Sequence, residues 1–387
     1  MPLSVPRWFR LLAFAGLAAL GLAARAAPLL SPELHADRRV TFRYAGPEQG
    51  PVELIGRGPG QHHDFPEDTY AMTRGADGVW EVTVGPLLPS LYWYRFRVAG
   101  TEVVDPVNGS VHDFFAGPWS QVEVPDPAPQ PWQPSRAVPA GRVEIRRIST
   151  QGAVGWDRPV YVYLPPGYRD DAPEPLPVVY LFHGWDFNER SWIEDGRVPT
   201  ILDNLIAAGR ARPMAVVMPL GFSFVPLGVP HWPADEEARW REQIVAGLIP
   251  WIEKNYRVGG DRRNRALAGF SMGGKNALVL ALGDPTLTAW VAAFSSGRNG
   301  LRNYPERYEP ARAPDAPRMR LIWLGWGNRD LYADQARTLV ERLRADGFSV
   351  TAHESDGRHT WRVWRDSFSA FAQRVFRPEE VEQGRHP

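Results

Sequence analysis

The sequence reads Gly269-Phe270-Ser271-Met272-Gly273-Gly274 between an apolar run at 266–268 and a helix-like stretch at 275–282. Strand, turn and helix in this order are typical of a nucleophile elbow, in which a serine occupies a strained turn. A side chain at either flanking glycine would collide with the neighbouring strand or helix. At the N-terminus of the following helix, the backbone N–H of Met272 points toward the carbonyl oxygen of the group under attack, on which negative charge develops. We interpret Ser271 as a nucleophile; the alternative is a glycine-rich turn whose serine caps the helix.

A second stretch at 221–225 starts in the same way, with Gly221, Phe222 and Ser223. Val225 stands where the second glycine should be, so Ser223 is a much weaker candidate.

Three histidines follow Ser271, and one of them is expected to take the proton of its hydroxyl. His386 lies in the tail and His353 lies on a predicted strand at 349–354, whereas His359 lies in the loop after that strand. Hydrolases with such an elbow carry serine, acid and histidine in this order along the chain, so we choose His359 as the base. The alternative is a histidine on a surface loop.

The acid that orients this histidine should follow the preceding strand. The predicted strand at 319–324 runs into a loop that contains Asp330, which we choose as the acid. Asp356 is a second choice, and Asp334 fits a helix cap.

The loop after the apolar run at 178–182 begins with His183, Gly184 and Trp185 and is expected to complete the oxyanion-binding site. The backbone N–H of Trp185 is the candidate donor, and Gly184 leaves room for the carbonyl oxygen to approach. We assign His183 a structural hydrogen-bonding role rather than that of a second base.

Residues 141–378 show strands and helices in alternation. Continuous apolar runs predict strands that are buried on both faces, and apolar residues at helical spacing predict the helices. The expected strands are 143–148, 160–164, 178–182, 215–218, 266–268, 289–294, 319–324 and 349–354; the expected helices are 200–208, 236–254 with a kink at Pro250, 275–282 and 334–345. This order predicts a doubly wound, mainly parallel sheet with its reactive groups at the carboxyl ends of strands.

Residues 27–124 differ, with short alternating strands at 40–44, 79–84 and 91–98. Such a pattern predicts an all-β sandwich of about a hundred residues. On the last strand Tyr92, Tyr94 and Phe96 share one face, which we assign to the core. Trp93 lies on the other face, where it is a candidate to stack on a sugar or to pack on the neighbouring domain.

Residues 1–26 have the pattern of a cleaved secretory signal peptide. Two arginines precede an apolar run at 11–24, which ends in the small-x-small sequence Ala24-Arg25-Ala26. We expect a mature chain that begins near Ala27, is periplasmic or secreted and has no stable membrane anchor. An uncleaved anchor is the alternative, which the short apolar run disfavours.

Six prolines within residues 125–140 predict an extended, semi-rigid linker between the two domains. Residues 379–387 are expected to be a tail.

Composition excludes several classes of protein. The 387 residues include 44 basic and 44 acidic side chains without a basic block, so no nucleic-acid partner is expected. The absence of cysteine excludes disulfides, thiolate nucleophiles and cysteine metal sites. The His62-His63 pair has no third ligand nearby, so we assign it to the solvated surface.

Four segments of the C-terminal domain resemble the esterase D superfamily, namely 158–168, 181–184, 268–274 and 357–361. This superfamily includes feruloyl and acetylxylan esterases of carbohydrate esterase family one, siderophore (enterochelin-type) trilactone esterases and mycolyltransferases. The resemblance spans about 141–376 and implies an α/β-hydrolase that cleaves esters without a metal or other cofactor. It implies Ser271, Asp330 and His359 as nucleophile, acid and base, and their spacings of 59 and 29 residues suit the family.

Four segments of the N-terminal domain resemble the early-set immunoglobulin-like domains that precede bacterial esterases, namely 39–42, 77–80, 91–94 and 104–106. Some such domains bind glycans, and many only pack against the catalytic domain.

The expected function is that of a secreted serine esterase that removes feruloyl or acetyl groups from plant polysaccharide fragments through an acyl-enzyme. Gly184, Trp192, Trp232 and Trp361 are candidate substrate-binding residues, although each tryptophan also fits a packing role. The alternatives are a siderophore trilactone esterase, an acyltransferase and a glycan-binding protein with a decayed hydrolase domain. Lys275, in the helix after the elbow, has no assigned role.

Overall fold

The computed structural model describes residues 28–46, 50–56, 64–114, 117–148, 158–221, 236–302 and 304–377. Several predicted features lie outside these residues, namely the signal peptide at 1–26, the His62-His63 pair, Ser223, Trp232, His386 and the tail at 379–387. Within the described part, no helix has the length and apolar character needed to cross a membrane.

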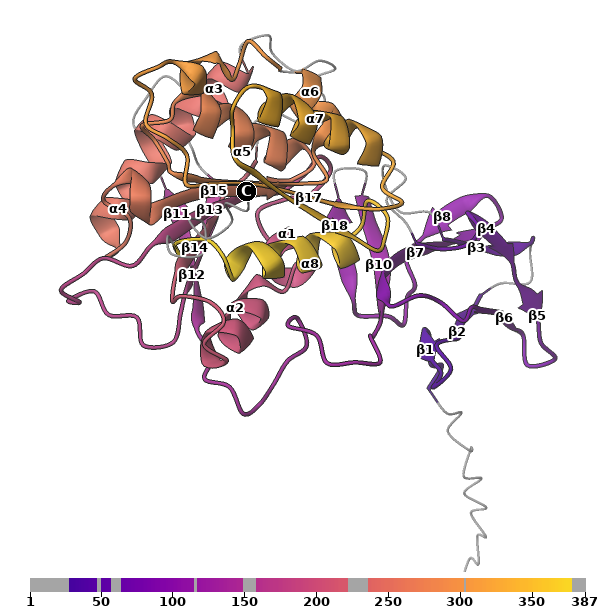
Figure 1. The fold of residues 1–387 in the computed structure, drawn as a ribbon. Coiled ribbons are helices and arrows are strands. Elements are labelled where there is room, and N and C mark those ends of the chain that lie inside the picture. Colours follow the sequence, from indigo (N-terminus) through magenta and orange to yellow (C-terminus); the bar gives the residue numbers. More distant parts are fainter. Residues whose placement is uncertain are drawn as a thin grey trace, which may run out of the picture.

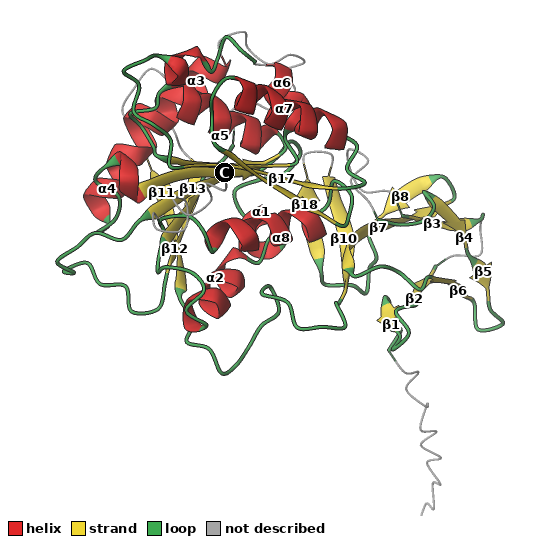
Figure 2. Ribbon diagram, in the orientation of Figure 1, coloured by secondary structure: helices red, strands yellow, loops and turns green. Residues whose placement is uncertain are grey.

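In the described residues, one eight-stranded sheet forms the centre of the C-terminal domain (Figures 1 and 2). Its order is β11-β12-β14-β13-β15-β16-β17-β18; β12 pairs antiparallel with both neighbours, and the strands from β14 onward pair in parallel. The bounds are Arg142–Ile148 (β11), Arg158–Leu164 (β12), Val178–Phe182 (β13), Ala215–Met218 (β14), Arg265–Phe270 (β15), Trp290–Phe294 (β16), Leu321–Gly327 (β17) and Val350–Ser355 (β18). The predicted doubly wound, mainly parallel sheet is confirmed.

Helices cover both faces of this sheet, with α3 to α7 on one face and α1, α2 and α8 on the other (Figure 1). Their bounds are Ser191–Glu194 (α1), Val198–Ala207 (α2), Glu236–Glu242 (α3), Ile249–Asn255 (α4), Met272–Gly283 (α5), Gly297–Arg302 (α6), Ala333–Ala345 (α7) and Trp361–Ala372 (α8). A π-helical segment, Gln243–Leu248, joins α3 to α4. The predicted kink at Pro250 is therefore not found at that residue, because the helix departs from α-helical geometry earlier, in the π-helical segment. Pro250 stands in the first turn of α4, where a missing backbone N–H costs little.

Between residues 28 and 124, which we call the N-terminal module, every described element is a strand. The strands form two antiparallel sheets, β1-β2-β6-β5 and β4-β3-β7-β10-β9, with β8 paired to β7. Their bounds are Glu33–Leu34 (β1), Val40–Ala45 (β2), Val52–Ile55 (β3), Thr69–Ala71 (β4), Thr73–Arg74 (β5), Val79–Val84 (β6), Ser90–Val98 (β7), Thr101–Val103 (β8), Val111–Phe114 (β9) and Gly117–Val124 (β10). Tyr92, Tyr94 and Phe96 lie in the core shared by the two sheets, as predicted.

Trp93 joins the N-terminal module to the catalytic domain. Its side chain is 1% exposed, and its ring centroid lies 5.2 Å from that of Phe114 and 5.8 Å from that of Phe187, which follows β13. Of the two roles considered for Trp93, the structure supports packing between domains.

Buried charges cross the same interface. Nδ1 of His112 lies 2.9 Å from Oδ2 of Asp195, and both side chains are fully buried. Arg365 of α8 donates from Nη1 to Glu123 of β10 at 2.6 Å and from Nε to the carbonyl of Asp195 at 2.6 Å. The two domains therefore form one packed body.

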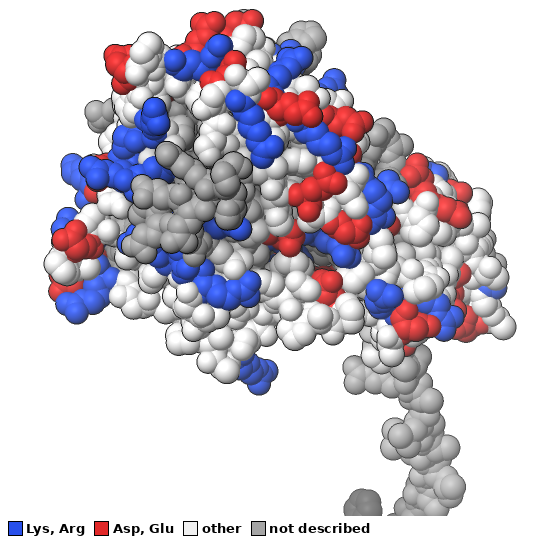
Figure 3. Space-filling model, in the orientation of Figure 1, with Lys and Arg blue, Asp and Glu red and all other residues white. Residues whose placement is uncertain are grey.

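The proline-rich linker is docked on the catalytic domain. Trp132 is 8% exposed and belongs to the core that contains Trp93 and Phe187. Nδ2 of Asn204 in α2 donates to the carbonyls of Pro131 and Gln133, at 2.8 and 2.9 Å. On the face that Figure 3 displays, basic and acidic side chains are intermingled, and neither sign of charge dominates.

Candidate active site

Ser271 lies at the turn between β15 and α5 with a strained backbone. Its φ of 51° and ψ of −118° place a non-glycine residue at positive φ, which costs about 1–3 kcal/mol and persists only where neighbours hold it. Its N–H donates to the carbonyl of Phe294 at 2.7 Å, and its carbonyl accepts from Oγ of Ser296 at 2.7 Å. These two contacts anchor the turn to the end of β16.

The flanking glycines are required by the close approach of the backbone. A Cβ on Gly269 would lie 2.6 Å from the backbone of Gly273 and 2.7 Å from the carbonyl oxygen of Phe182. A Cβ on Gly273 would lie 2.6 Å from that same oxygen and would also strike the carbonyl of His183. The steric reason predicted for both glycines is confirmed.

Strand register brings the following loops to one edge of the sheet. Phe182 of β13 pairs with Gly269 of β15, and Gly327 of β17 pairs with Ser355 of β18. Because parallel strands end together, the loops that carry Gly184, Ser271, Asp330 and His359 all start at the carboxyl edge.

His359 and Asp330 form a buried pair at this edge. Nδ1 of His359 lies 3.0 Å from Oδ2 and 3.1 Å from Oδ1 of Asp330, and the side chains are 1% and 0% exposed. Burial opposes the charge on Asp330, but His359 and the backbone N–H of Tyr332 hold the pKa of its carboxyl below the usual value. A neutral His359 that donates from Nδ1 to this carboxylate carries its lone pair on Nε2, the form that a general base needs.

Trp364 of α8 links this pair to β15, the strand that ends just before Ser271. Its ring stacks on Phe270, the residue before Ser271, with centroids 4.0 Å apart, and it meets the ring of His359 edge to face at 5.1 Å. Phe187 packs against Phe270 as well, at 5.1 Å. Neither role is predicted from the sequence, although Trp364 lies three residues after Trp361 on one helical face.

The other candidate acids and bases lie elsewhere. His353 pairs with Asp366 at 2.7 Å, and Asp356 pairs with Arg329 at 3.0 Å on the exposed surface. Asp334 is 94% exposed. Of these carboxylates, the structure brings only Asp330 to His359 among the residues it describes.

The loop after β13 lies against the elbow. A Cβ on Gly184 would come within 2.5 Å of the Phe270 ring and 3.2 Å of Cβ of Ser271. Nε2 of His183 accepts from the N–H of Gly221 at 2.8 Å and Nδ1 contacts the carbonyl of Gly184 at 2.7 Å, which confirms its structural role. The Trp185 side chain is 46% exposed.

The predicted substrate contacts of Trp192 and Trp361 are not supported. These side chains are 1% and 0% exposed, and their rings pack against each other at 5.2 Å and against Phe270. Nε1 of Trp192 donates to the carbonyl of Phe182. Both tryptophans are core residues beneath the elbow.

Lys275, to which the sequence assigns no role, pairs with Glu237 at 3.3 Å.

No group of three or more His, Cys, Asp or Glu side chains in the described residues is arranged to hold a metal ion.

The Esterase family model, described as "Putative esterase", matches residues 151–375, which include the elbow and the His359–Asp330 pair. The chain belongs to the Esterase family. This membership places it among carboxylic ester hydrolases.

Curated relatives cover different parts of the chain. An endo-1,4-beta-xylanase/feruloyl esterase of Xylanibacter ruminicola is 30% identical over 317 residues, which cover 79% of this chain and 41% of that protein. An esterase of Mycobacterium tuberculosis is 36% identical over 136 residues, or 33% of this chain and 27% of that protein. The chain thus spans less than half the length of either relative.

Solved structures share the fold. The ferulic acid esterase AmCE1/Fae1A of Anaeromyces mucronatus is 21% identical with a TM-score of 0.55, covering 65% of this chain and 97% of that chain. The enterobactin esterase of Shigella flexneri is 18% identical with a TM-score of 0.61, covering 88% and 93%. Both confirm the α/β-hydrolase type of the catalytic domain.

Proposed function

We propose that the protein is a serine esterase in which Ser271 is the nucleophile, His359 the base and Asp330 the acid that orients it. The observation that carries this proposal is the buried contact of 3.0 Å between His359 and Asp330 at the sheet edge where Ser271 is held at positive φ. Nε2 of His359 takes the hydroxyl proton as Oγ of Ser271 attacks the ester carbonyl. The N–H groups of Met272 and Trp185 stabilise the resulting oxyanion. His359 then protonates the leaving alcohol, and water releases the acyl group by the same steps.

The proposed substrate is an aromatic acyl ester, of the feruloyl type, on a plant polysaccharide fragment. The name of the Xylanibacter ruminicola relative supports this class. The side chains of Trp185 and Leu331, from the loops after β13 and β17, are 46% and 48% exposed and give an apolar surface at the carboxyl edge. An acetyl group would use little of this surface, because burial of apolar area scales with the size of the group. We also propose that the chain is secreted or periplasmic, and that its N-terminal module is an early-set immunoglobulin-like domain.

A siderophore trilactone is the second candidate substrate. The enterobactin esterase structure covers 88% of this chain, which is more than the catalytic domain alone. Acyl transfer is a further alternative.

The test is hydrolysis by the purified protein beside Ser271→Ala on a short-chain nitrophenyl ester, methyl ferulate, acetylated xylan and a catecholate trilactone. We expect Ser271→Ala to lower kcat by about 10⁴-fold or more, and methyl ferulate to be preferred. We expect Trp185→Ala, which keeps its backbone N–H, to raise KM for methyl ferulate about tenfold, because an apolar contact is lost, while KM for the nitrophenyl ester stays unchanged. An active Ser271→Ala would refute the nucleophile. A preference for the trilactone would refute the substrate class, and inactivity of the wild type across the panel would contradict ester hydrolysis.

A further inference from the structure

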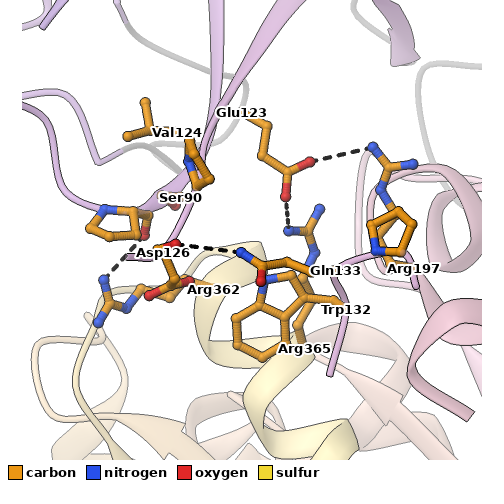
Figure 4. Close-up of a pocket in the computed structure, with 12 residues that line it drawn as sticks. Ser90, Glu123, Val124, Asp126, Trp132, Gln133, Arg197, Arg362 and Arg365 are labelled. Atoms are coloured by element: carbon orange, nitrogen blue, oxygen red, sulfur yellow. Dashed lines mark hydrogen bonds and ion pairs between the residues drawn. The ribbon is translucent and has the colours of Figure 1, made fainter. Parts of the chain in front are cut away.

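A cavity of about 220 Å³ lies where the N-terminal module, the linker and α8 meet, and Figure 4 shows its lining. The module contributes Ser90 and Glu123, the linker contributes Asp126 and Trp132, and α8 contributes Arg362 and Arg365. Pockets for drug-sized ligands measure roughly 300–1,000 Å³. The cavity therefore suits a ligand of about one monosaccharide.

The cavity carries an excess of positive charge. Arg197, Arg362 and Arg365 line it, against the carboxyl groups of Glu123 and Asp126. Figure 4 shows Glu123 between two of the arginines, 2.6 Å from Arg365 and 3.3 Å from Arg197. Glu123 therefore pairs with two of the three arginines. The third, Arg362, donates to the carbonyl of Pro89 at 3.1 Å and lies 3.8 Å from the carboxylate of the exposed Asp356. Three guanidinium groups facing two carboxylates favour an anionic ligand.

Arg365 has a buried hydrogen-bond donor to offer. The side chain is 3% exposed; Nε and Nη1 donate to Asp195 and Glu123, but no acceptor among the described residues meets Nη2. A buried guanidinium with an unmet N–H costs free energy, which an anionic ligand with two oxygens would recover. Burial lowers the pKa of the Arg365 guanidinium, although Glu123 opposes the shift.

The remaining lining suits a sugar ring. The indole of Trp132 forms one wall, and aromatic faces pack well on the apolar faces of pyranose rings. A second hollow of about 350 Å³ adjoins the cavity, and the two share Gln133 and Pro134. Polar side chains such as Gln130, Asn204 and Arg210 alternate there with prolines, Leu205 and Ala208, so a chain attached to the ring would leave over a mixed polar and apolar surface.

We propose that the cavity binds a uronic acid, with its carboxylate held by Arg362 and Arg365 and its ring against Trp132. This binding site is separate from the elbow and does not depend on the proposed ester hydrolysis. The ligand is either the free monosaccharide or a uronic acid branch on a polysaccharide.

Isothermal titration of the full chain with D-glucuronic acid tests the proposal. D-glucose is the matched neutral ring, and acetate is the carboxylate without a ring. We expect binding of glucuronic acid at least tenfold tighter than that of either control. A charge-assisted hydrogen bond contributes about 1.5–3 kcal/mol, so Arg362→Gln should weaken binding at least tenfold. Arg169→Gln, at an arginine whose side chain is 71% exposed and which does not line the cavity, is the matched control and should leave binding unchanged.

Asp126→Asn tests the same charge balance in the opposite direction. Burial raises the pKa of Asp126, although Arg362 and Arg365 oppose the rise. Removal of its negative charge should tighten glucuronate binding about threefold, as expected for a partly screened like charge, and a misfolded protein would not produce such a gain. A glucuronic-acid-bearing xylo-oligosaccharide that binds more tightly than the monosaccharide would assign the ligand to a polysaccharide branch. Equal affinity would assign it to the free acid.

Equal affinities for glucuronic acid and acetate would overturn the proposal, and so would glucuronate binding that Arg362→Gln leaves intact in a folded protein. Titration of Ser271→Ala separates this proposal from the catalytic one. Ser271→Ala should still bind glucuronate. A wild-type protein that binds glucuronate but hydrolyses no ester of the panel would refute the proposed esterase alone, whereas a wild-type protein that hydrolyses an ester but does not bind glucuronate would refute the cavity proposal alone.

Discussion

Phe187→Ala is expected to destabilise the protein and to impair catalysis, because this ring connects the N-terminal module to the elbow. Phe187 is 1% exposed. Its ring centroid lies 5.1–5.9 Å from six other rings, those of Trp93, His112, Phe114, Phe270, Trp361 and Trp364. Truncation of a buried phenylalanine costs about 3–5 kcal/mol in all, and because Phe187 contacts six rings its cost should lie in the upper part of that range. We therefore expect a loss of about 4–5 kcal/mol in the free energy of unfolding.

Urea unfolding followed by tryptophan fluorescence measures this loss, with kcat/KM on a nitrophenyl ester measured at a temperature where the variant is folded. The matched control is Phe42→Ala, which removes a fully buried ring from the core of the N-terminal module. We expect both variants to lose stability, but only Phe187→Ala to lose about tenfold or more in kcat/KM, since Phe270 loses its support next to Ser271. A loss below about 2 kcal/mol, or equal activity in the two variants, would show that the interface does not support the elbow.

Three other changes test separate parts of the structure. Asp330→Asn should lower kcat about 10³–10⁴-fold with little change in KM, as measured by steady-state kinetics, because the histidine loses the partner that holds its tautomer. Burial opposes the charge on His112, but the nearby Asp195 raises the pKa of this imidazole above its usual value. The pair therefore contributes its full stabilisation below the unfolded pKa of about 6.5, and this contribution is lost as the pH rises through the higher pKa of the folded state. Urea unfolding between pH 6 and 9 should therefore show falling stability in the wild type and a flatter profile in His112→Asn; equal slopes would contradict this pairing. Gly273→Ala would place a Cβ 2.6 Å from a carbonyl at the end of β13 and should lower the free energy of unfolding by at least about 2 kcal/mol. Gly109→Ala, where a Cβ meets nothing within 4 Å, should leave the thermal midpoint unchanged.

The sheet and the pairing of His359 with Asp330 could be predicted from the sequence because both depend on local patterns. Continuous apolar runs mark the buried parallel strands, and the chain order of serine, acid and histidine selects among few candidates. The predicted strands at 178–182 and 215–218 match β13 and β14 residue for residue.

The environment of the tryptophans could not be predicted, because burial depends on contacts between distant segments. Trp361 follows His359 closely in sequence and was therefore a candidate for the substrate site, yet it starts α8 and points into the core. The helix itself has a readable signal, since Trp361, Trp364, Phe368 and Phe371 recur at helical spacing. For Trp93, strand alternation predicts that the ring faces away from the core of the N-terminal module, but not that its partner is Phe187, which is distant in sequence.

A module on a flexible tether raises the local concentration of a polymer but samples many positions along it. Here Trp132 is packed in the core and Asn204 binds the linker backbone, so the N-terminal module keeps one distance from Ser271. A polysaccharide that contacts both the module and the active site would therefore be bound at one fixed spacing between the two contacts. For the polysaccharide substrate proposed above, we expect the module to determine which acyl group along the polysaccharide reaches Ser271.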